Sequence, residues 1–367
     1  MKVAIVHYWL VGMRGGEKVI ESLCRLFPEA DVYTHVYDPS AISTVIKSHQ
    51  IRTTFISRLP FAVRNYKSYL PLMPLALEQL DLSAYDVIIS SESGPAKGII
   101  PPPNALHVCY CHSPMRYIWN MFHEYHRRSG FVTRMAMPAL SHYLRNWDVI
   151  SSTRTHHFVA NSRNVAQRLQ TYYRRDATVI YPPVSVGDFA AVPHDEVGDY
   201  WLMVGELVAY KRPDLAIEAF NRAGKRLVVI GGGEMLSRLR AAAGPTVTIL
   251  GPQPFDVLRH HYARCRALVF PGEEDFGIVP VEAMASGRPV IAFKRGGATE
   301  SVVDGTSGVF FDNQTVEDLL QAVARCEALQ LDPAAIVAHA QQFSAETFAA
   351  RMKAFVDERL AERGMAA

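Results

Sequence analysis

The chain has 367 residues, of which 49% are hydrophobic and 20% charged, and its formal net charge is +2. This length exceeds the usual size of one hydrophobic core, so we expect two domains of a soluble, enzyme-sized protein without a nucleic-acid partner. The absence of any run of about 18 apolar residues argues against a transmembrane helix, and five cysteines without C-x-x-C spacing argue against a disulfide scaffold.

The first residues, MKVAIVHYWLVG, resemble a short signal peptide only in part. His7 interrupts the apolar run and no small-residue cleavage site follows it. We therefore expect a first β-strand here and a cytoplasmic protein. Residues 1–186 carry 20 Lys and Arg against 12 Asp and Glu, whereas the remainder carries 18 against 24. Either the two halves have different partners, or the asymmetry reflects solvated faces alone.

Short apolar runs alternate with helical patterns along the whole chain. Strands are predicted at residues 2–8, 86–91, 106–111 and 156–162, then at 200–206, 226–232, 247–251, 267–272 and 289–293. Helices are predicted at residues 17–27, 213–223, 255–265 and 315–329. Because the strand runs are almost continuously apolar, we expect parallel strands covered on both faces.

This alternation predicts an α/β protein with two doubly wound parallel-sheet domains that face each other across a cleft. Prolines, glycines and acids at residues 181–199 indicate the linker, which places the domains at 1–184 and 185–343. In the last segment, 344–367, Ser344 suits a helix N-cap, with Phe343, Phe348 and Phe355 as an apolar face. This helix could pack on the second domain or cross back to the first.

Three features follow predicted strands, where ligands of open α/β sheets gather. Gly15 and Gly16 form a turn before a helix and suit a phosphate site or a plain tight turn. The stretch GGGEM at 231–235, which contains Gly233, lacks the third glycine of a dinucleotide motif and leaves another nucleotide loop open. Lys211 precedes a helix beginning near Pro213 and could meet a phosphate.

The segment PGEEDFGIVPVEAMASGRPVIA at 271–292 contains four acids. Pro280 and Gly287 suit the first turn and the end of a helix, which places Glu282 in its first turn and Glu274 in the preceding loop. The N–H groups of three residues would form an anion site between the two carboxylates: Phe276, Gly277 and Ile278. A ligand with hydroxyls at both ends and phosphate between them, a nucleotide sugar, matches this order.

The spacing from Glu274 to Glu282 resembles the E-x7-E motif of retaining glycosyltransferases of family 4, which have the GT-B fold. Further segments that follow the family's order are the Gly15-Gly16 turn, YCHSPMRYIW (110–119), FVANSRNVAQRL (158–169), YPPV (181–184), the Lys211 segment, ALVFPGEEDFG (267–277) and FKRGGATESV (293–302). The CHSPMRYIW variant is similar to bacterial mannosyltransferases that build O-antigen, capsule or exopolysaccharide repeats.

This resemblance implies a role for individual residues. Glu274 would hold hydroxyls of the transferred sugar, Glu282 the ribose, and Lys211 the donor diphosphate. Gly16 would donate its N–H near the phosphate, and His112 would contact the transferred sugar. The other expected donor-binding residues are Gly15, Arg212, Gly233, Phe276, Gly277 and Ile278. The residues expected on the acceptor side are Arg116, Tyr117, Asn161 and Ser162.

One position departs from the family pattern. Many relatives carry an arginine five residues before the lysine, where this chain has Glu206. A carboxylate there would repel the diphosphate, so we expect Glu206 to point away or to pair with Arg212. Lys211 and the helix N-termini would then supply most of the diphosphate binding, with a further contribution from Arg212 or Arg295.

The implied reaction retains the anomeric configuration and needs no metal and no cofactor besides the donor, for which the resemblance favours GDP-mannose. No Asp-x-Asp motif follows a strand of the first half, and His123 and His126 lack a persuasive third ligand. Residues 57–80 and 117–143 mix basic and apolar side chains, so they could lie on an anionic membrane, at the inner membrane's cytoplasmic face, or cover an interior sheet.

We expect a polyprenyl-diphosphate-linked or saccharide acceptor. Three alternatives stay open: a glycosyltransferase that uses a UDP-sugar, a sugar-nucleotide epimerase or hydrolase on the same fold, and a sugar-nucleotide sensor without catalysis.

Overall fold

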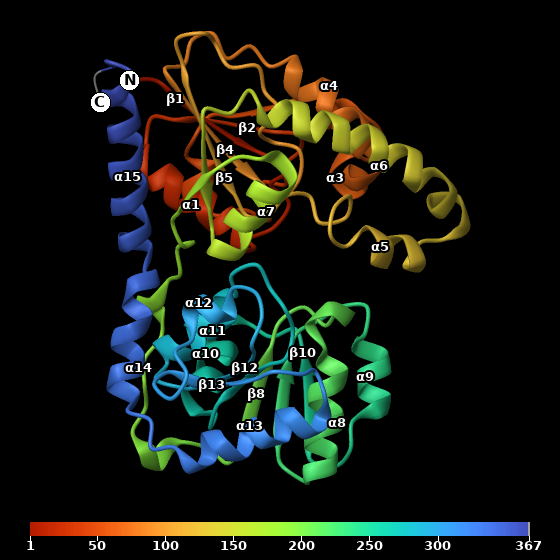
Figure 1. The fold of residues 1–367 in the computed structure, drawn as a ribbon, viewed down its shortest axis with the longest axis vertical. Coiled ribbons are helices and arrows are strands. Elements are labelled where there is room, and N and C mark those ends of the chain that lie inside the picture. The colour runs from red at the N-terminus through yellow and green to blue at the C-terminus, as the bar shows by residue number, and fades with distance from the viewer. Residues whose placement is uncertain (366–367) are drawn as a thin grey trace. The chain divides into compact units, whose positions relative to one another are not determined.

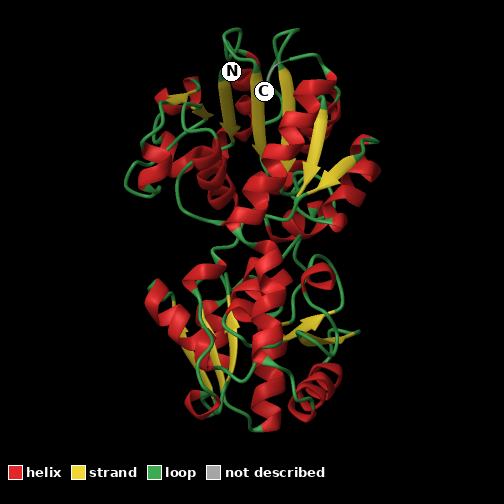
Figure 2. Ribbon diagram, turned by 90° about the vertical axis from the view of Figure 1, so that its left-hand side faces the viewer, coloured by secondary structure: helices red, strands yellow, loops and turns green. Residues whose placement is uncertain are grey.

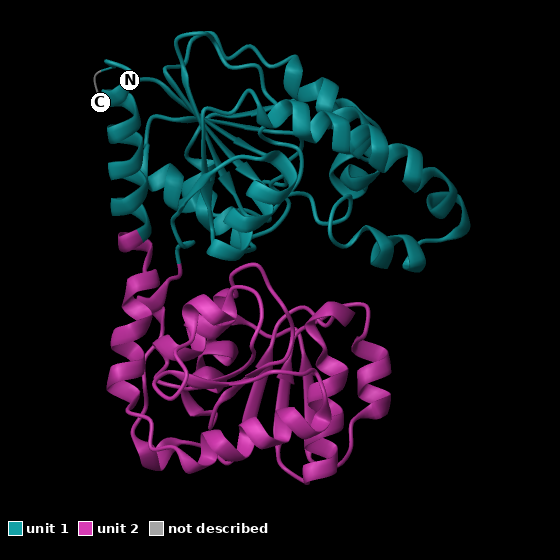
Figure 3. Cartoon of the chain, viewed as in Figure 1, with its two compact units in different colours: residues 1–183, 348–367 teal, residues 184–347 magenta. Residues whose placement is uncertain are grey.

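The structure, a computed structural model, describes residues 1–365 and divides into two compact units (Figure 3). Unit 1 consists of residues 1–183 together with the chain from Phe348 onward, and unit 2 consists of Val184–Thr347. Each unit contains one sheet of parallel strands with helices on its faces (Figure 2). The α/β class and the two doubly wound parallel sheets predicted from the sequence are therefore confirmed.

The sheet of unit 1 has the strand order β3-β2-β1-β4-β5-β6-β7. Figure 1 labels its strands β1, β2, β4 and β5. Its strands are β1 (Val3–His7), β2 (Asp31–Thr34), β3 (Ile51–Thr53), β4 (Val87–Glu92), β5 (Leu106–Cys111), β6 (His157–Ala160) and β7 (Ala177–Val179). Its helices are α1 (Gly15–Leu26), α2 (Thr44–Lys47), α3 (Ala62–Asn65), α4 (Met73–Glu78), α5 (Phe122–Arg128), α6 (Phe131–Ser152), α7 (Arg163–Tyr173) and α15 (Ala345–Glu362).

Both faces of this sheet are buried, as its continuous apolar runs require. Val3 and Ile5 belong to a core cluster that also contains side chains of α1 and α15. Ala4 and Val6, which point to the opposite face, belong to a cluster with side chains of α4 and α6. The alternation along β1 thus joins two separate cores through one strand.

The sheet of unit 2 has the order β10-β9-β8-β11-β12-β13. Its strands are β8 (Trp201–Val204), β9 (Leu227–Ile230), β10 (Val247–Gly251), β11 (Leu268–Phe270), β12 (Val290–Phe293) and β13 (Gly308–Phe311). Its helices are α8 (Pro213–Ala223), α9 (Leu236–Ala242), α10 (Phe255–Arg264), α11 (Ile278–Ala285), α12 (Ala298–Ser301), α13 (Val316–Ala328) and α14 (Pro333–Ala340).

Two details of the sequence interpretation were wrong. Phe343 does not share a face with Phe348 and Phe355: it lies in a short 3-10 helix, η6 (Gln341–Phe343), and its ring contacts Phe276 of unit 2. The two other rings lie in the core of unit 1, so the last helix crosses back to the first sheet from its N-cap at Ser344.

The second correction concerns helix α11, which starts at Ile278 because Gly277 serves as its N-cap with a left-handed φ of 89°. Pro280 is consequently the third helical residue, and Glu282 lies in the second turn instead of the first. A Pro side chain is tolerated throughout the first turn, so its presence did not fix the starting residue.

Strand order reverses at one place in each sheet, between β1 and β4 in unit 1 and between β8 and β11 in unit 2. Ligands of doubly wound sheets bind at the carboxyl ends of the strands that flank such a switch point. Most sequence-predicted site residues follow these strands or their immediate neighbours. Within residues 1–365 no helix is both long and apolar enough to cross a membrane.

Candidate functional site

In unit 2, a lysine and a glutamate meet at the switch point. Lys211 ends a short 3-10 helix, η5 (Ala209–Lys211), after β8, and Glu274 lies in the loop after β11. Lys211 Nζ is 2.7 Å from Glu274 Oε1, and the two side chains are 16% and 20% exposed. Burial lowers the pKa of Lys211, but the acidic groups around it, Glu274 first among them, together raise the pKa above its ordinary value. The ammonium is therefore charged at neutral pH.

Glycines pack closely on Lys211 and on the chain beside it. A Cβ on Gly205, which follows β8, would lie 3.5 Å from Lys211 Nζ, and one on Gly272, which follows β11, would lie 2.5 Å from Lys211 Cα. Gly233, after β9, packs equally closely on the backbone carbonyl of Leu207. The glycines after β8 and β11 thus pack on Lys211, and the glycine after β9 packs on the neighbouring Leu207.

The start of α11 lies beside this pair. Gly277 turns the chain into the helix, and the N–H groups of Ile278 and Val279, in its first turn, have no intrahelical acceptor. Phe276 is buried, with its ring centroid 5.5 Å from that of Phe343, and Gly297 N donates to Glu274 O at 2.9 Å. These contacts fix the loop that carries Glu274, and they leave the helix N-terminus able to bind an anion.

The second carboxylate of the motif is held by a tyrosine that sequence reasoning missed. Tyr262, in α10, donates its hydroxyl hydrogen to Glu282 Oε2 at 2.7 Å. Its ring is buried in a T-shaped contact with Phe189, and burial together with Glu282 raises the pKa of the phenol well above its usual value. The phenol therefore stays a hydrogen-bond donor, which fixes the orientation of the carboxylate.

Arg212 and Glu206 do not pair with each other as one sequence hypothesis proposed. Arg212 has a left-handed φ of 52° at the start of α8, and its Nε donates to Asp214 at 3.2 Å. Glu206 is exposed and contributes to the raised pKa of Lys211. Glu274 and Glu206 thus both place negative charge near Lys211. The guanidinium of Arg212 is already hydrogen-bonded to Asp214.

In unit 1, three side chains form a chain of hydrogen bonds across the ends of three adjacent strands. His112, directly after β5, has Nε2 2.8 Å from Ser91 Oγ in β4, and the same Oγ is 3.2 Å from His7 Nδ1 in β1. Burial lowers the pKa of His112 to about 4 and that of His7 well below its ordinary value. Both imidazoles are neutral near pH 7, so each carries one N–H and one acceptor nitrogen.

Helix α1 begins beside this chain. Gly15 is its first residue, and a Cβ on Gly16 would lie only 2.4 Å from Tyr8 Oη, so no other residue fits without displacing the tyrosine. Arg14 N donates to the buried carboxylate of Glu17 at 3.1 Å, and burial raises the pKa of Glu17. In the expected glycine turn, the backbone of Gly16 thus lies close to the hydroxyl of Tyr8.

The expected acceptor-side residues have unequal accessibility. Arg116 and Tyr117 are partly exposed after β5, and the Tyr117 hydroxyl donates to Met115 Sδ at 2.9 Å. Ser162 is fully buried: its Oγ caps α7 by accepting from Val165 N at 3.1 Å and donates to Asn161 Oδ1 at 3.0 Å. Asn161 is also buried, so these two side chains support the end of β6 from within.

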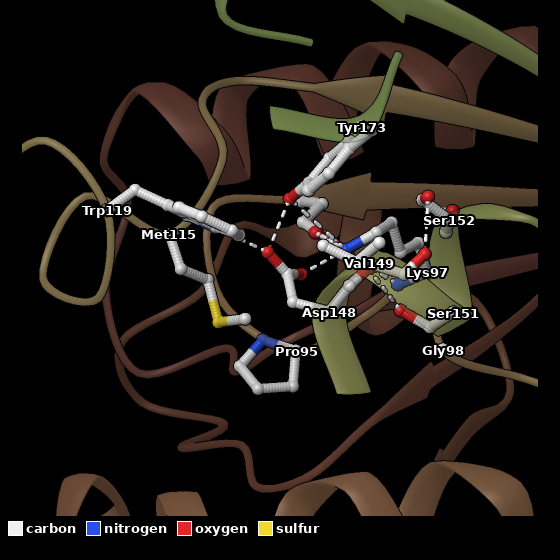
Figure 4. Close-up of polar contacts among 12 residues, drawn as sticks. Pro95, Lys97, Gly98, Met115, Trp119, Asp148, Val149, Ser151, Ser152 and Tyr173 are labelled. Atoms are coloured by element: carbon white, nitrogen blue, oxygen red, sulfur yellow. Dashed lines mark hydrogen bonds and ion pairs between the residues drawn. The ribbon is translucent and has the colours of Figure 1, made fainter. Parts of the chain in front are cut away.

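A buried ion network anchors the segment that follows His112 (Figure 4). Lys97 Nζ donates to Glu92 Oε1 at 2.6 Å and to Asp148 of α6, and all three side chains are inaccessible to solvent. Asp148 Oδ2 also accepts from Trp119 Nε1 and from the Tyr173 hydroxyl, each at 2.7 Å. The carbonyl of Glu92 accepts from His112 N at 2.8 Å, so the network and the histidine share one strand end.

His123 and His126 lie on α5 outside both groups of residues. Within residues 1–365 no cluster of three His, Cys, Asp or Glu side chains could hold a metal ion.

Comparisons with known proteins agree with this architecture. Residues 13–187 match the family Glycosyltransferase Family 4, and residues 188–343 match Glycosyl transferases group 1. A D-inositol 3-phosphate glycosyltransferase from Segniliparus rotundus is 32% identical over 222 residues, which cover 52% of this chain and 49% of that protein. The chain spans about half the length of the curated relatives it matches.

Two solved structures cover nearly the whole chain. Sucrose-phosphate synthase from Thermosynechococcus elongatus is 18% identical with a TM-score of 0.71 and covers 99% of this chain and 100% of its own. Anabaena HepE in complex with UDP-glucose is 16% identical with a TM-score of 0.69, over 98% of this chain and 100% of its own. The two neighbours show the fold, which is GT-B. The two consecutive family matches, over residues 13–187 and 188–343, show that the chain belongs to the group 1/family 4 glycosyltransferases.

Proposed function

We propose that this protein transfers a hexosyl group from a nucleoside diphosphate sugar to a hydroxyl of a lipid-linked or saccharide acceptor, with retention of configuration. The observation that carries the proposal is the Lys211–Glu274 pair at the switch point of unit 2, beside the start of α11. GDP-mannose is the donor we put first, because the CHSPMRYIW segment resembles mannosyltransferases. UDP-glucose is the alternative, because HepE binds it on the same fold.

Each part of such a donor has a counterpart among these residues. An ammonium has three N–H donors, so Lys211 can keep Glu274 and still donate to a diphosphate oxygen. The free N–H groups at the start of α11 add donors and the positive end of a helix dipole. Glu274 would accept from hydroxyls of the transferred sugar, and Glu282, oriented by Tyr262, from the ribose. Each such charge-assisted bond contributes about 1.5–3 kcal/mol.

In the proposed reaction, the bond between the anomeric carbon and the diphosphate oxygen breaks while the acceptor oxygen bonds to the same face of that carbon. The proton of the acceptor hydroxyl passes to the departing phosphate, as the family resemblance implies. Lys211 stabilises the negative charge that develops on the leaving diphosphate, and loss of such a group typically slows turnover by about 100- to 1,000-fold. His112 is the residue of unit 1 that we expect to contact the substrates.

Radiolabelled GDP-mannose, UDP-glucose and UDP-GlcNAc, each with and without polyprenyl-diphosphate-linked sugar, test the proposal on the full chain. We expect acceptor-dependent transfer from one donor and its loss in Lys211→Ala and Glu274→Ala. The matched controls Arg222→Ala and Glu317→Ala remove an exposed ion pair of the same unit and should retain transfer.

Other outcomes would assign the other functions. Conversion of a donor without acceptor would indicate an epimerase or hydrolase, and tight nucleotide binding without turnover would indicate a sensor. Wild-type turnover by both Lys211→Ala and Glu274→Ala would refute the site.

A further inference from the structure

The first half of α6, residues 131–140, exposes several large apolar side chains. All buried residues of this helix lie at or after Ser141, although it begins at Phe131. Phe131 and Val132 are each 80% exposed and Met135 is 69% exposed. Soluble proteins seldom expose several large apolar side chains together, and such groups mark contact sites for proteins or membranes.

This exposed segment is rigidly attached. The second half of α6 is anchored in unit 1 through the buried Asp148 and its partner Lys97 (Figure 4). In the same helix, Trp147 Nε1 donates to Glu78 at 3.1 Å. Beyond these anchors, the first turns of α6 and helix α5 extend away from the sheet of unit 1 (Figure 1). At the turn between the helices, Arg134 Nη2 donates to the carbonyls of Arg127 at 2.7 Å and Ser129 at 3.2 Å. The exposed side chains thus lie on an ordered projection, which we call the hairpin tip, residues 127–135.

The charge around the hairpin tip is positive. Residues 122–147 contain four arginines and a single acid, Glu124. That acid already pairs with Arg128 at 3.3 Å, and Arg127 and Arg134 are exposed. Exposed apolar side chains bordered by arginine suit the boundary between acyl chains and anionic headgroups. A symmetric contact between two tips would instead place like charges together.

We propose that the hairpin tip is a membrane-docking element, which inserts Phe131, Val132 and Met135 below the headgroups of an anionic bilayer while Arg127 and Arg134 meet the phosphates. The purpose of this docking rests on the proposed transfer to a lipid-linked acceptor, but the docking itself requires no nucleotide sugar. The hydrophobic insertion makes the binding persist in salt, and the arginines make it selective for anionic lipid.

Sedimentation of the full chain with vesicles tests this directly, in 50 and 300 mM NaCl and without nucleotide. Vesicles of phosphatidylcholine with 30% phosphatidylglycerol are compared with phosphatidylcholine alone. We expect at least tenfold stronger partitioning to the anionic vesicles. In the triple variant F131S/V132S/M135S this partitioning should be at least tenfold weaker. R127Q leaves the Arg134 hydrogen bonds of the turn in place and should reduce the preference for anionic lipid and the salt dependence.

Two control variants locate the effect. V303S/L329S removes exposed apolar side chains of unit 2, and F61S/L72S/L75S removes three exposed apolar side chains elsewhere in unit 1. Both should bind like the wild type. Loss of binding in F61S/L72S/L75S but not in the tip variant would overturn the assignment, as would unchanged binding by the tip variant. A tip variant that alters only the oligomeric state, in light scattering without lipid, would show that a protein covers this surface instead.

Transfer assays separate this inference from the proposed function. F131S/V132S/M135S should transfer normally to a water-soluble acceptor and at least tenfold more slowly to an acceptor embedded in anionic vesicles. Equal loss with both acceptors would contradict membrane docking. Absence of transfer by the wild type, with vesicle binding intact, would refute the proposed function alone.

Discussion

Replacing Tyr262 by Phe removes one hydroxyl and keeps the buried ring, so it isolates the hydrogen bond to Glu282. That bond, at 2.7 Å between a buried phenol and a carboxylate, contributes about 1.5–3 kcal/mol to the free energy of unfolding. Without it, the carboxylate of Glu282 is held less firmly before the ligand binds, and ordering a Glu side chain costs about 1.5–2 kcal/mol. Nucleoside diphosphate binding should therefore weaken about 10- to 30-fold.

Isothermal titration calorimetry with GDP, UDP and pyrophosphate measures this. Pyrophosphate lacks the ribose, so Tyr262→Phe and Glu282→Gln should leave its binding unchanged, whereas Lys211→Ala should weaken all three ligands. The matched control is Tyr200→Phe, which removes a hydroxyl that donates to His261 O, in the same helix as Tyr262. Unchanged GDP and UDP binding by Tyr262→Phe, with weakened binding by Glu282→Gln, would refute the positioning role of the tyrosine.

Three further predictions concern unit 1. Lys97→Met should lower the free energy of unfolding by about 3–5 kcal/mol, because it leaves the buried carboxylates of Glu92 and Asp148 without their cation. Burial raises the pKa of Glu92, so urea titrations should find a smaller loss at low pH, where Glu92 takes up a proton. Ser91→Ala should change the tautomer of His112, visible in its imidazole nitrogen shifts by NMR, while the transition in urea stays cooperative. Burial lowers the pKa of His107 to about 3. Below pH 6.5, His107 therefore binds a proton in the unfolded chain but stays neutral in the folded one. Stability should fall as pH falls, and His107→Gln should reduce the loss between pH 7.5 and 5.5 by about 1.4 kcal/mol.

The elements that could be predicted are those with long or strongly apolar patterns. The predicted helix at 213–223 matches α8 residue for residue, and the strand at 106–111 matches β5. The missed strands were β2, β3, β7 and β13. Their length is not the reason, because β11 and β12 have only three and four residues and were predicted. β3 and β7 are the edges of their sheet and contain an exposed residue, so they lack the apolar continuity of the central strands.

The sequence predicts the site residues that share one short segment. It does not predict contacts between residues that are far apart in the sequence and become neighbours only in the folded chain. Glu274 and Glu282 belong to one motif, and the strand-to-loop position of Lys211 could be inferred from its own surroundings. Tyr262 lies 20 residues before Glu282 on another helix, and Ser91 is 84 residues from His7. Nothing in either local sequence marks a tyrosine or serine as the partner of a distant acid or histidine, because hydrogen bonds of this kind depend on which strands and helices become neighbours.

The environment of the two carboxylates bears on the choice between transfer and acid–base chemistry. Glu274 faces an ammonium at 2.7 Å, and Glu282 accepts from a phenol at 2.7 Å. A general acid must hold a proton near neutral pH, usually because burial disfavours its charge. Here each carboxylate faces a donor of the protein, and a carboxylate with its two oxygens can accept more than one hydrogen bond. An epimerase or hydrolase needs one of them to exchange a proton with substrate, whereas a transferase needs both only as acceptors.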